Sequence, residues 1–198
     1  MEPSLNEQSS LKLIESMINK AKNNFSESGT LYLVWGVVIF VCSITQFIAT
    51  YFYQYEHAYY VWFLTWLVLI YQLIFIAKKK KKEKVKTYTG EILGYVWTCF
   101  IVCLFVLMFI LQYNKAFFLI NSVILVLYAI PTFLSGGILK VKSLMIGGIC
   151  CWLLAVISIF IPVEFHILLI SVAVLIAWII PGIIMRKKYL EVNTGTGM

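Results

Sequence analysis

The sequence predicts an all-α polytopic membrane protein with about six transmembrane helices, preceded by an N-terminal amphipathic helix. Of its 198 residues 62% are hydrophobic and only 13% are charged, whereas soluble domains have about 45–50% and about 25%. The mean hydropathy is +0.91. Six apolar stretches approach or exceed the roughly 20 residues that a helix needs to cross a bilayer. A water-soluble globular fold is therefore excluded.

The polar segment 1–29 is predicted to lie on the cytoplasmic side of the membrane and to contain an amphipathic helix, Ser9 to Asn24. Apolar residues recur in it at spacings of three, four and seven, which places them on one face of a helix. We call this face the head stripe. Its members are Leu11, Ile14, Ile18 and Phe25. We expect Gly29 to end the helix before the membrane, and the head stripe to bind a partner.

Six spans are predicted after this head, with short connections except in one place. The predicted spans are Leu31–Thr50, Ala58–Ala77, Ile92–Leu111, Phe117–Gly137, Leu144–Ile161 and Ile167–Met185. The exception is a basic loop, 78–90, which is too short to fold alone. The predicted organisation is a head (1–29), a bundle (30–186) and a cytoplasmic tail (187–198).

The basic residues divide unequally between the two sides of the predicted bundle. If both termini lie inside, only Lys115 of the 16 Lys and Arg falls outside. Basic residues are retained on the cytoplasmic side, so we expect a multi-pass protein of the bacterial inner membrane with both termini in the cytoplasm. The net charge of +7 is explained by this topology, and we expect no DNA binding.

Lysines are concentrated in the predicted basic loop. They are Lys78, Lys79, Lys80, Lys81, Lys82, Lys84 and Lys86. Each can attract anionic lipid by about 1 kcal/mol near the membrane surface, which is the favoured interpretation. Contact with a protein or an RNA is the alternative, although Tyr88 is the only aromatic residue beside the run that could stack on a base.

Residues that could perform chemistry are scarce in this chain. It has no Asp, and its predicted spans contain no ionisable side chain. We therefore expect no enzymatic activity, no cofactor and no catalytic or metal-binding residue. His57 and His166 are predicted to be solvated residues of the outer loops; with Glu56 and Glu164 they are also the weaker candidate for a metal site.

Amides and small residues within the spans have two interpretations. Gln46, Gln72 and Asn121 either bond between helices, which we favour, or line a path for a neutral solute. The pairs Gly136-Gly137 and Gly147-Gly148 either allow close helix packing, which we favour, or form a hinge.

Two segments at the ends of the chain, LIESMINKAKNNFSESGTLYLVWG (13–36) and IPGIIMRKKYLE (180–191), resemble small bacterial multi-span membrane proteins. Some proteins of this type are encoded beside type VI-B CRISPR RNA-guided RNases and modulate RNA interference. The resemblance implies a non-enzymatic accessory or regulatory protein of antiviral defence, with a cytosolic protein or ribonucleoprotein as partner. It assigns no functional residue. The alternative function is a small neutral-solute channel or transporter, either single or as a homo-oligomer.

Overall fold

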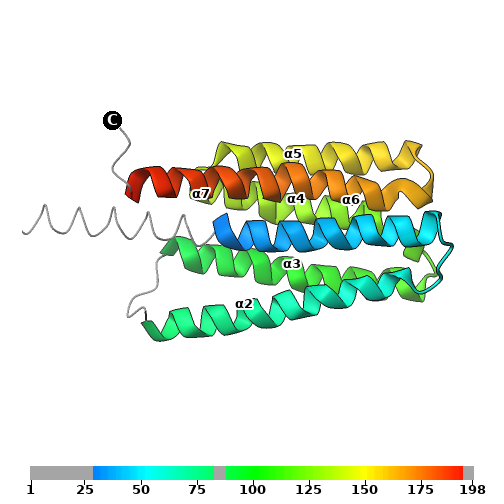
Figure 1. The fold of residues 1–198 in the computed structure, drawn as a ribbon, viewed down its shortest axis with the longest axis horizontal. Helices are drawn as coiled ribbons and strands as arrows, with labels where there is room; N and C mark the ends of the chain where they lie inside the picture. The colour runs from blue at the N-terminus through cyan, green and yellow to red at the C-terminus, as the bar shows by residue number, and fades with distance from the viewer. Residues whose placement is uncertain (1–28, 83–87, 194–198) are drawn as a thin grey trace, which may run out of the picture.

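The computed structural model describes residues 29–82 and 88–193, and all regular structure in these ranges is helical (Figure 1). Six helices are long and apolar enough to cross a membrane, which confirms the predicted fold class. They run side by side and alternate in direction. The spans are Gly29–Tyr51, Ala58–Phe75, Thr89–Tyr113, Phe117–Leu139, Lys142–Phe160 and Val163–Lys187.

Most spans are built from more than one helical element. The second span contains η1 (Ala58–Trp62) and α2 (Phe63–Lys82), the third is α3 (Tyr88–Tyr113), and the fourth contains η2 (Phe117–Leu119) and α4 (Ile120–Leu139). The fifth contains α5 (Lys142–Ile157) and η3 (Ser158–Phe160). The sixth contains η4 (Val163–Phe165), α6 (His166–Val174), η5 (Leu175–Ile179) and α7 (Ile180–Asn193).

Two boundaries differ from the prediction. Gly29 is helical and does not break the chain, because it lies against the sixth span, where a side chain would come within 3.0 Å of Met185 Cβ. The basic loop is shorter than predicted, because 78–82 continue α2 as helix and α3 begins at Tyr88. Lysine is a good helix former, so the helix need not end where the apolar sequence ends.

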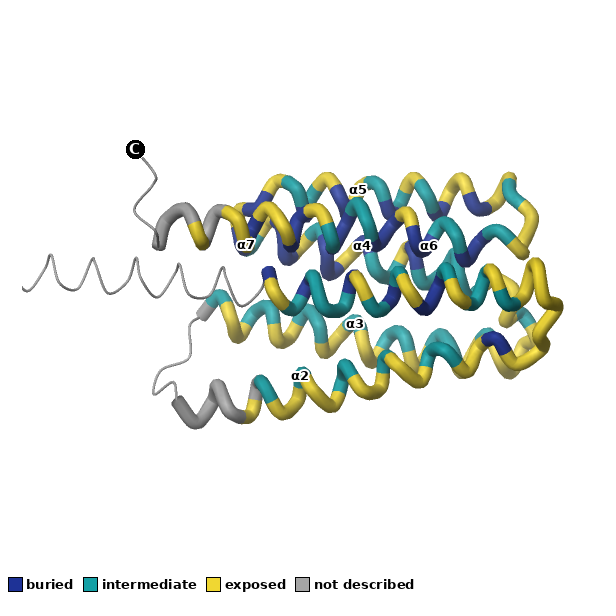
Figure 2. Tube along the Cα trace, in the orientation of Figure 1, coloured by how far each residue is buried: buried dark blue, intermediate teal, exposed yellow. Residues whose placement is uncertain are grey.

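The sixth span is the centre of the bundle. Half of the residues in its most apolar segment are buried inside the protein, compared with 6% in the second span and none in the third. Figure 2 shows the buried residues gathered on the helices around the sixth span, whereas α2 and α3 are largely exposed. The apolar side chains that α2 and α3 expose are suited to contact with lipid, which solvates them as well as a protein core would.

Glycines let the helices approach one another closely. A side chain at Gly147 would lie 2.5 Å from Ala177 Cα, and one at Gly36 would lie 2.8 Å from Ile179 Cγ1. Both distances are too short for a carbon atom, so a side chain at Gly147 would push against the backbone of the sixth span and one at Gly36 would displace the Ile179 side chain. Gly136 and Gly148 are equally confined, against Met145 and Phe133, which confirms the packing interpretation for three of the four paired glycines. The fourth, Gly137, faces open space.

The sixth span also contains a π-helical turn, η5, directly before a proline. Ile180 N–H bonds to Leu175 O, five residues back instead of four. Pro181 has no N–H to continue the ordinary helical pattern, and a wider turn accommodates that gap. The turn carries Trp178, which is buried at the centre of the bundle.

The close approach at Gly147 gives a direct stability prediction. Gly147→Ala should lower the free energy of unfolding by about 1–3 kcal/mol, because the new methyl group overlaps Ala177. Gly137→Ala is the matched control and should be neutral or stabilising by up to about 1 kcal/mol, since alanine favours helix. Thermal unfolding of both purified variants in detergent measures the difference. Equal stability of the two would contradict the packing described for the fifth and sixth spans.

Candidate functional site

The head stripe and part of the lysine run lie outside the described residues. Leu11, Ile14, Ile18 and Phe25 precede residue 29, and Lys84 and Lys86 fall between α2 and α3. The structure describes only the backbone of Lys78–Lys82, which is helical. Both predicted contact surfaces therefore stay predictions. The described residues form three other features: polar pairs between spans, a central aromatic cluster and a groove.

Two glutamines join the first span to the second. Trp35 Nε1 donates a hydrogen bond of 2.6 Å to Gln72 Oε1, and Trp62 Nε1 donates one of 2.5 Å to Gln46 Oε1. The interpretation of these amides as interhelical bonds is confirmed. Asn121 has no side-chain hydrogen bond within the described part of the chain, so its role stays a prediction.

A serine pair joins the first span to the sixth. Ser43 Oγ and Ser171 Oγ lie 2.7 Å apart, and both side chains are buried. Beside Ser43, the Cys42 thiol lies 3.4 Å from the Val61 carbonyl oxygen of the second span. The first span thus bonds to the second on one side and to the sixth on another. All five thiols of the chain are unpaired.

His166 is a structural residue, which corrects its prediction as a solvated loop residue. It begins α6 and is only 5% exposed. Its Nε2–H donates to the Ile161 carbonyl at 2.9 Å, and its Nδ1 lies 3.5 Å from Ser122 Oγ. Ser158 donates to Ser122 at 2.8 Å, so the chain of bonds connects the fourth, fifth and sixth spans. A short 3-10 turn brings His166 into the bundle instead of leaving it in the loop.

His57 lies in an exposed loop, as predicted, and stacks on the ring of Tyr60. Glu56 and Glu164 are also exposed. No group of three or more His, Cys, Asp or Glu side chains within residues 29–82 and 88–193 could hold a metal ion. The structure therefore does not bring His57, His166 and the two glutamates together as one group.

The centre of the bundle holds an aromatic cluster that the sequence analysis did not identify. Trp178 lies 4.6 Å from Tyr128, 5.7 Å from Trp97 and 5.8 Å from Tyr32, measured between ring centroids. Its Nε1 donates to Thr132 Oγ1 at 3.2 Å. Four spans contribute to this cluster, so the polar edge of the indole is bonded within it and does not face a water-filled space.

Two buried hydroxyls differ from the hydrogen-bonded polar groups described above. Ser135 Oγ and Ser143 Oγ have no hydrogen-bond partner within the described ranges. They lie in α4 and α5, at the end of the bundle where Lys140 and Lys142 also lie. We call this end, which contains Gly29, Lys82 and Tyr88 as well, the basic end.

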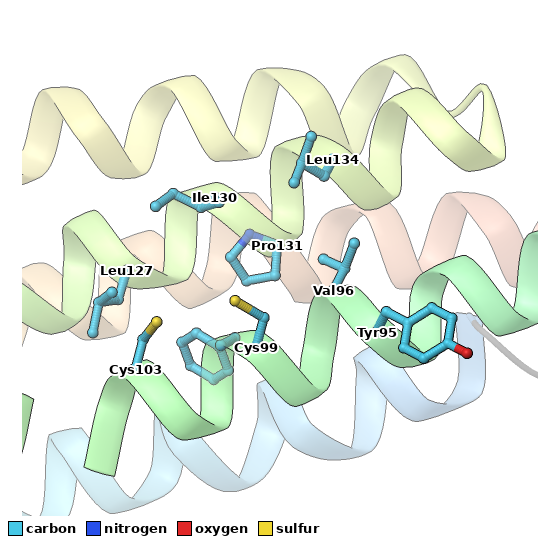
Figure 3. Close-up of a pocket in the computed structure, with 9 residues that line it drawn as sticks. Tyr95, Val96, Cys99, Cys103, Leu127, Ile130, Pro131 and Leu134 are labelled. Carbon is cyan, nitrogen blue, oxygen red and sulfur yellow. The ribbon is translucent and has the colours of Figure 1, made fainter. Parts of the chain in front are cut away.

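A groove of about 340 Å³ lies between α3 and α4, in the half of the bundle nearer to the basic end (Figure 3). Its walls are almost entirely apolar. The side chains drawn in Figure 3 come from the facing sides of the two helices and include Val96, Cys99, Cys103, Leu127, Ile130 and Leu134. Cys99 and Cys103 are part of this wall and have no acid, base or metal ligand beside them in the groove. The groove therefore offers a surface for an apolar ligand.

Comparison with known protein families, with curated proteins and with solved structures finds no match to this chain. The proposals that follow therefore depend on the residues of the chain itself.

The two histidines should respond differently to replacement. His166→Ala should lower the free energy of unfolding by about 1–3 kcal/mol, because it leaves the Ile161 carbonyl without its side-chain partner and removes the link from Ser122 to the sixth span. His57→Ala, at an exposed position, should change stability by no more than about 0.5 kcal/mol. The free energies of unfolding of both variants are measured in mixed detergent micelles and compared with that of the parent protein. If the two variants unfold alike, the buried bond network does not hold the three spans together.

Proposed function

We propose that the chain is a non-enzymatic membrane accessory protein that engages a cytosolic partner at its basic end. One observation carries the proposal: six pairs of polar side chains within the spans bond helix to helix. The pairs are Trp35–Gln72, Trp62–Gln46, Ser43–Ser171, Ser122–Ser158, Ser122–His166 and Trp178–Thr132. Polar groups placed in this way stabilise helix association in lipid and do not transport a solute.

The alternative function, a neutral-solute channel or transporter, requires polar groups that face a continuous path. Gln46, Gln72 and Asn121 were the candidates for lining it, and both glutamines accept hydrogen bonds from tryptophans of neighbouring spans. The middle of the bundle is filled by the rings around Trp178. A channel built by a single copy would have to break these contacts before it could open, so the accessory role is the better supported of the two.

Under this proposal the basic end lies in the cytoplasm of a bacterial cell, with the protein in the inner membrane. The described cationic side chains at this end include Lys140, Lys142, Arg186 and Lys187, whereas Lys115 is at the other end. This distribution follows the positive-inside rule. Under the proposal the head, the lysine run and the tail lie on this same side, where they can contact the same partner.

The partner that we propose is a ribonucleoprotein, namely an RNA-guided RNase of the type VI-B class. The support is the resemblance of segments 13–36 and 180–191 to membrane proteins encoded beside such RNases. The head stripe is proposed to make the contact. Six spans already fix the protein in the membrane, so an amphipathic helix beside them adds little as an anchor and is better used in a groove of a partner.

Charged substitutions in the head stripe test this proposal. Ile14→Glu with Ile18→Glu should reduce co-purification of the RNase with the tagged full-length protein by more than about 100-fold, because two apolar anchors are lost. RNA interference in cells should return to its level without the membrane protein. Membrane abundance should stay unchanged, since no span is altered.

A matched control adds the same charge to the opposite face of the head. Asn19→Glu with Asn23→Glu should bind the RNase like the parent protein. If the stripe variant also binds like the parent while replacement of Lys78–Lys82 by Gln abolishes binding, the lysine run makes the contact and the head stripe does not. If no variant and no parent protein captures the RNase, this partner is wrong.

A further inference from the structure

The groove between α3 and α4 has the size and the walls of a ligand site. Its volume of about 340 Å³ lies in the range of small-molecule pockets, about 300–1,000 Å³. Ile130 and Leu134 on α4 and Cys99 on α3 are exposed, so the groove opens to the outside of the bundle. The outside of a transmembrane bundle is the bilayer. An occupant therefore enters sideways, from the lipid.

A positively charged residue lies beyond the groove on α4, at the basic end. Lys140 ends α4 in the left-handed conformation, with φ 56°, and its exposed side chain lies six residues beyond Leu134. Two backbone bonds hold this turn, from Val141 N–H to Gly136 O at 2.8 Å and from Lys140 N–H to Gly137 O at 3.3 Å. This is a regular helix C-cap, so the backbone position of Lys140 is set by hydrogen bonds.

Open space lies one turn beyond the groove on α4, at Gly137. Gly137 lies one turn beyond Leu134 on α4, and a side chain there would meet no atom within 4 Å. An elongated apolar molecule can therefore lie along α4 from the groove toward the basic end without a clash at this position. The length of a helix from Leu134 to Lys140 is about 9 Å, which separates the apolar wall from the charge.

The charges at this end favour an anion. Lys140, Lys142, Arg186 and Lys187 are exposed cations here. The described acid nearest to the groove is Glu91, in the first turn of α3, and its carboxylate already accepts a hydrogen bond from Tyr95 Oη at 3.1 Å. An apolar groove near an end of the bundle that is rich in positive charge is complementary to an amphiphile with an anionic headgroup.

We propose that the α3/α4 groove binds one acyl chain of an anionic phospholipid whose phosphate contacts Lys140. The chain fills the space between two helices that leave it open, and the lysine selects the headgroup. A bound lipid of this kind joins α3 to the rest of the bundle. α3 is the span whose apolar segment has no residue buried inside the protein. The site is independent of the partner proposed above, because it lies on residues that the head stripe does not include.

Native mass spectrometry of the purified full-length protein tests the proposal. Phosphatidylglycerol and phosphatidylcholine with identical acyl chains are added separately, and the fraction of protein that retains one lipid is measured. The parent protein should retain phosphatidylglycerol preferentially. Lys140→Gln should reduce this preference about five-fold and leave phosphatidylcholine binding unchanged, as expected for one lysine at the membrane surface. Lys115→Gln, at the other end, is the charge-matched control and should behave like the parent.

Filling the groove tests the acyl-chain part of the proposal. Ile130→Trp should abolish retention of both lipids, whereas Leu153→Trp, on the exposed face of α5, should not. If Ile130→Trp fails to fold, Cys99→Phe fills the same groove from α3. The proposal is overturned if the parent retains both lipids equally, if Lys115→Gln lowers retention as much as Lys140→Gln, or if a folded groove-filling variant retains phosphatidylglycerol like the parent.

Discussion

The close contact of the sixth span with its neighbours is the constraint on which the rest of the bundle depends. A lipid bilayer provides no hydrophobic force between helices, so association requires tight packing and polar bonds. Both are concentrated on this span. Gly36 and Gly147 accept its π-helical turn at distances that no side chain would permit, and Ser43 and Thr132 bond to its Ser171 and Trp178. The second span is bonded to the first by Gln46 and Gln72, and the third contributes Trp97 to the central cluster, but both spans remain mostly exposed.

This concentration explains why the interior suits a scaffold more than a transport path. A transporter needs polar groups that exchange partners during its cycle and surfaces that separate. Here Gln46, Gln72, Ser43, Ser171 and His166 bond to neighbouring spans, and an aromatic cluster occupies the middle. Among the described residues, the exposed charged side chains lie at the two ends of the bundle, chiefly at the basic end. A role in binding at the membrane surface uses those side chains, and lipid in the α3/α4 groove would support the least buried span.

The sequence predicted the architecture well, because hydropathy and span length depend on composition and little on tertiary contacts. It also predicted that Gln46 and Gln72 bond between helices, since a buried amide in lipid must find a partner. It did not predict the structural role of His166, because Pro162 and Glu164 beside it are typical of a loop. The cluster around Trp178 was missed for a different reason. Tryptophan is common at membrane interfaces, and only the tertiary arrangement of four spans shows that this one is central.

Disulfide formation between the first and sixth spans tests the central packing most directly. In a variant without native cysteines, Ser43→Cys and Ser171→Cys replace two oxygens that lie 2.7 Å apart in the bundle. Mild oxidation in native membranes should join the two thiols within one chain, because a disulfide requires closely facing side chains. Neither thiol should react with a water-soluble thiol reagent beforehand. Free thiols after oxidation, labelled readily by that reagent, would contradict the account and place water where the structure has a closed contact.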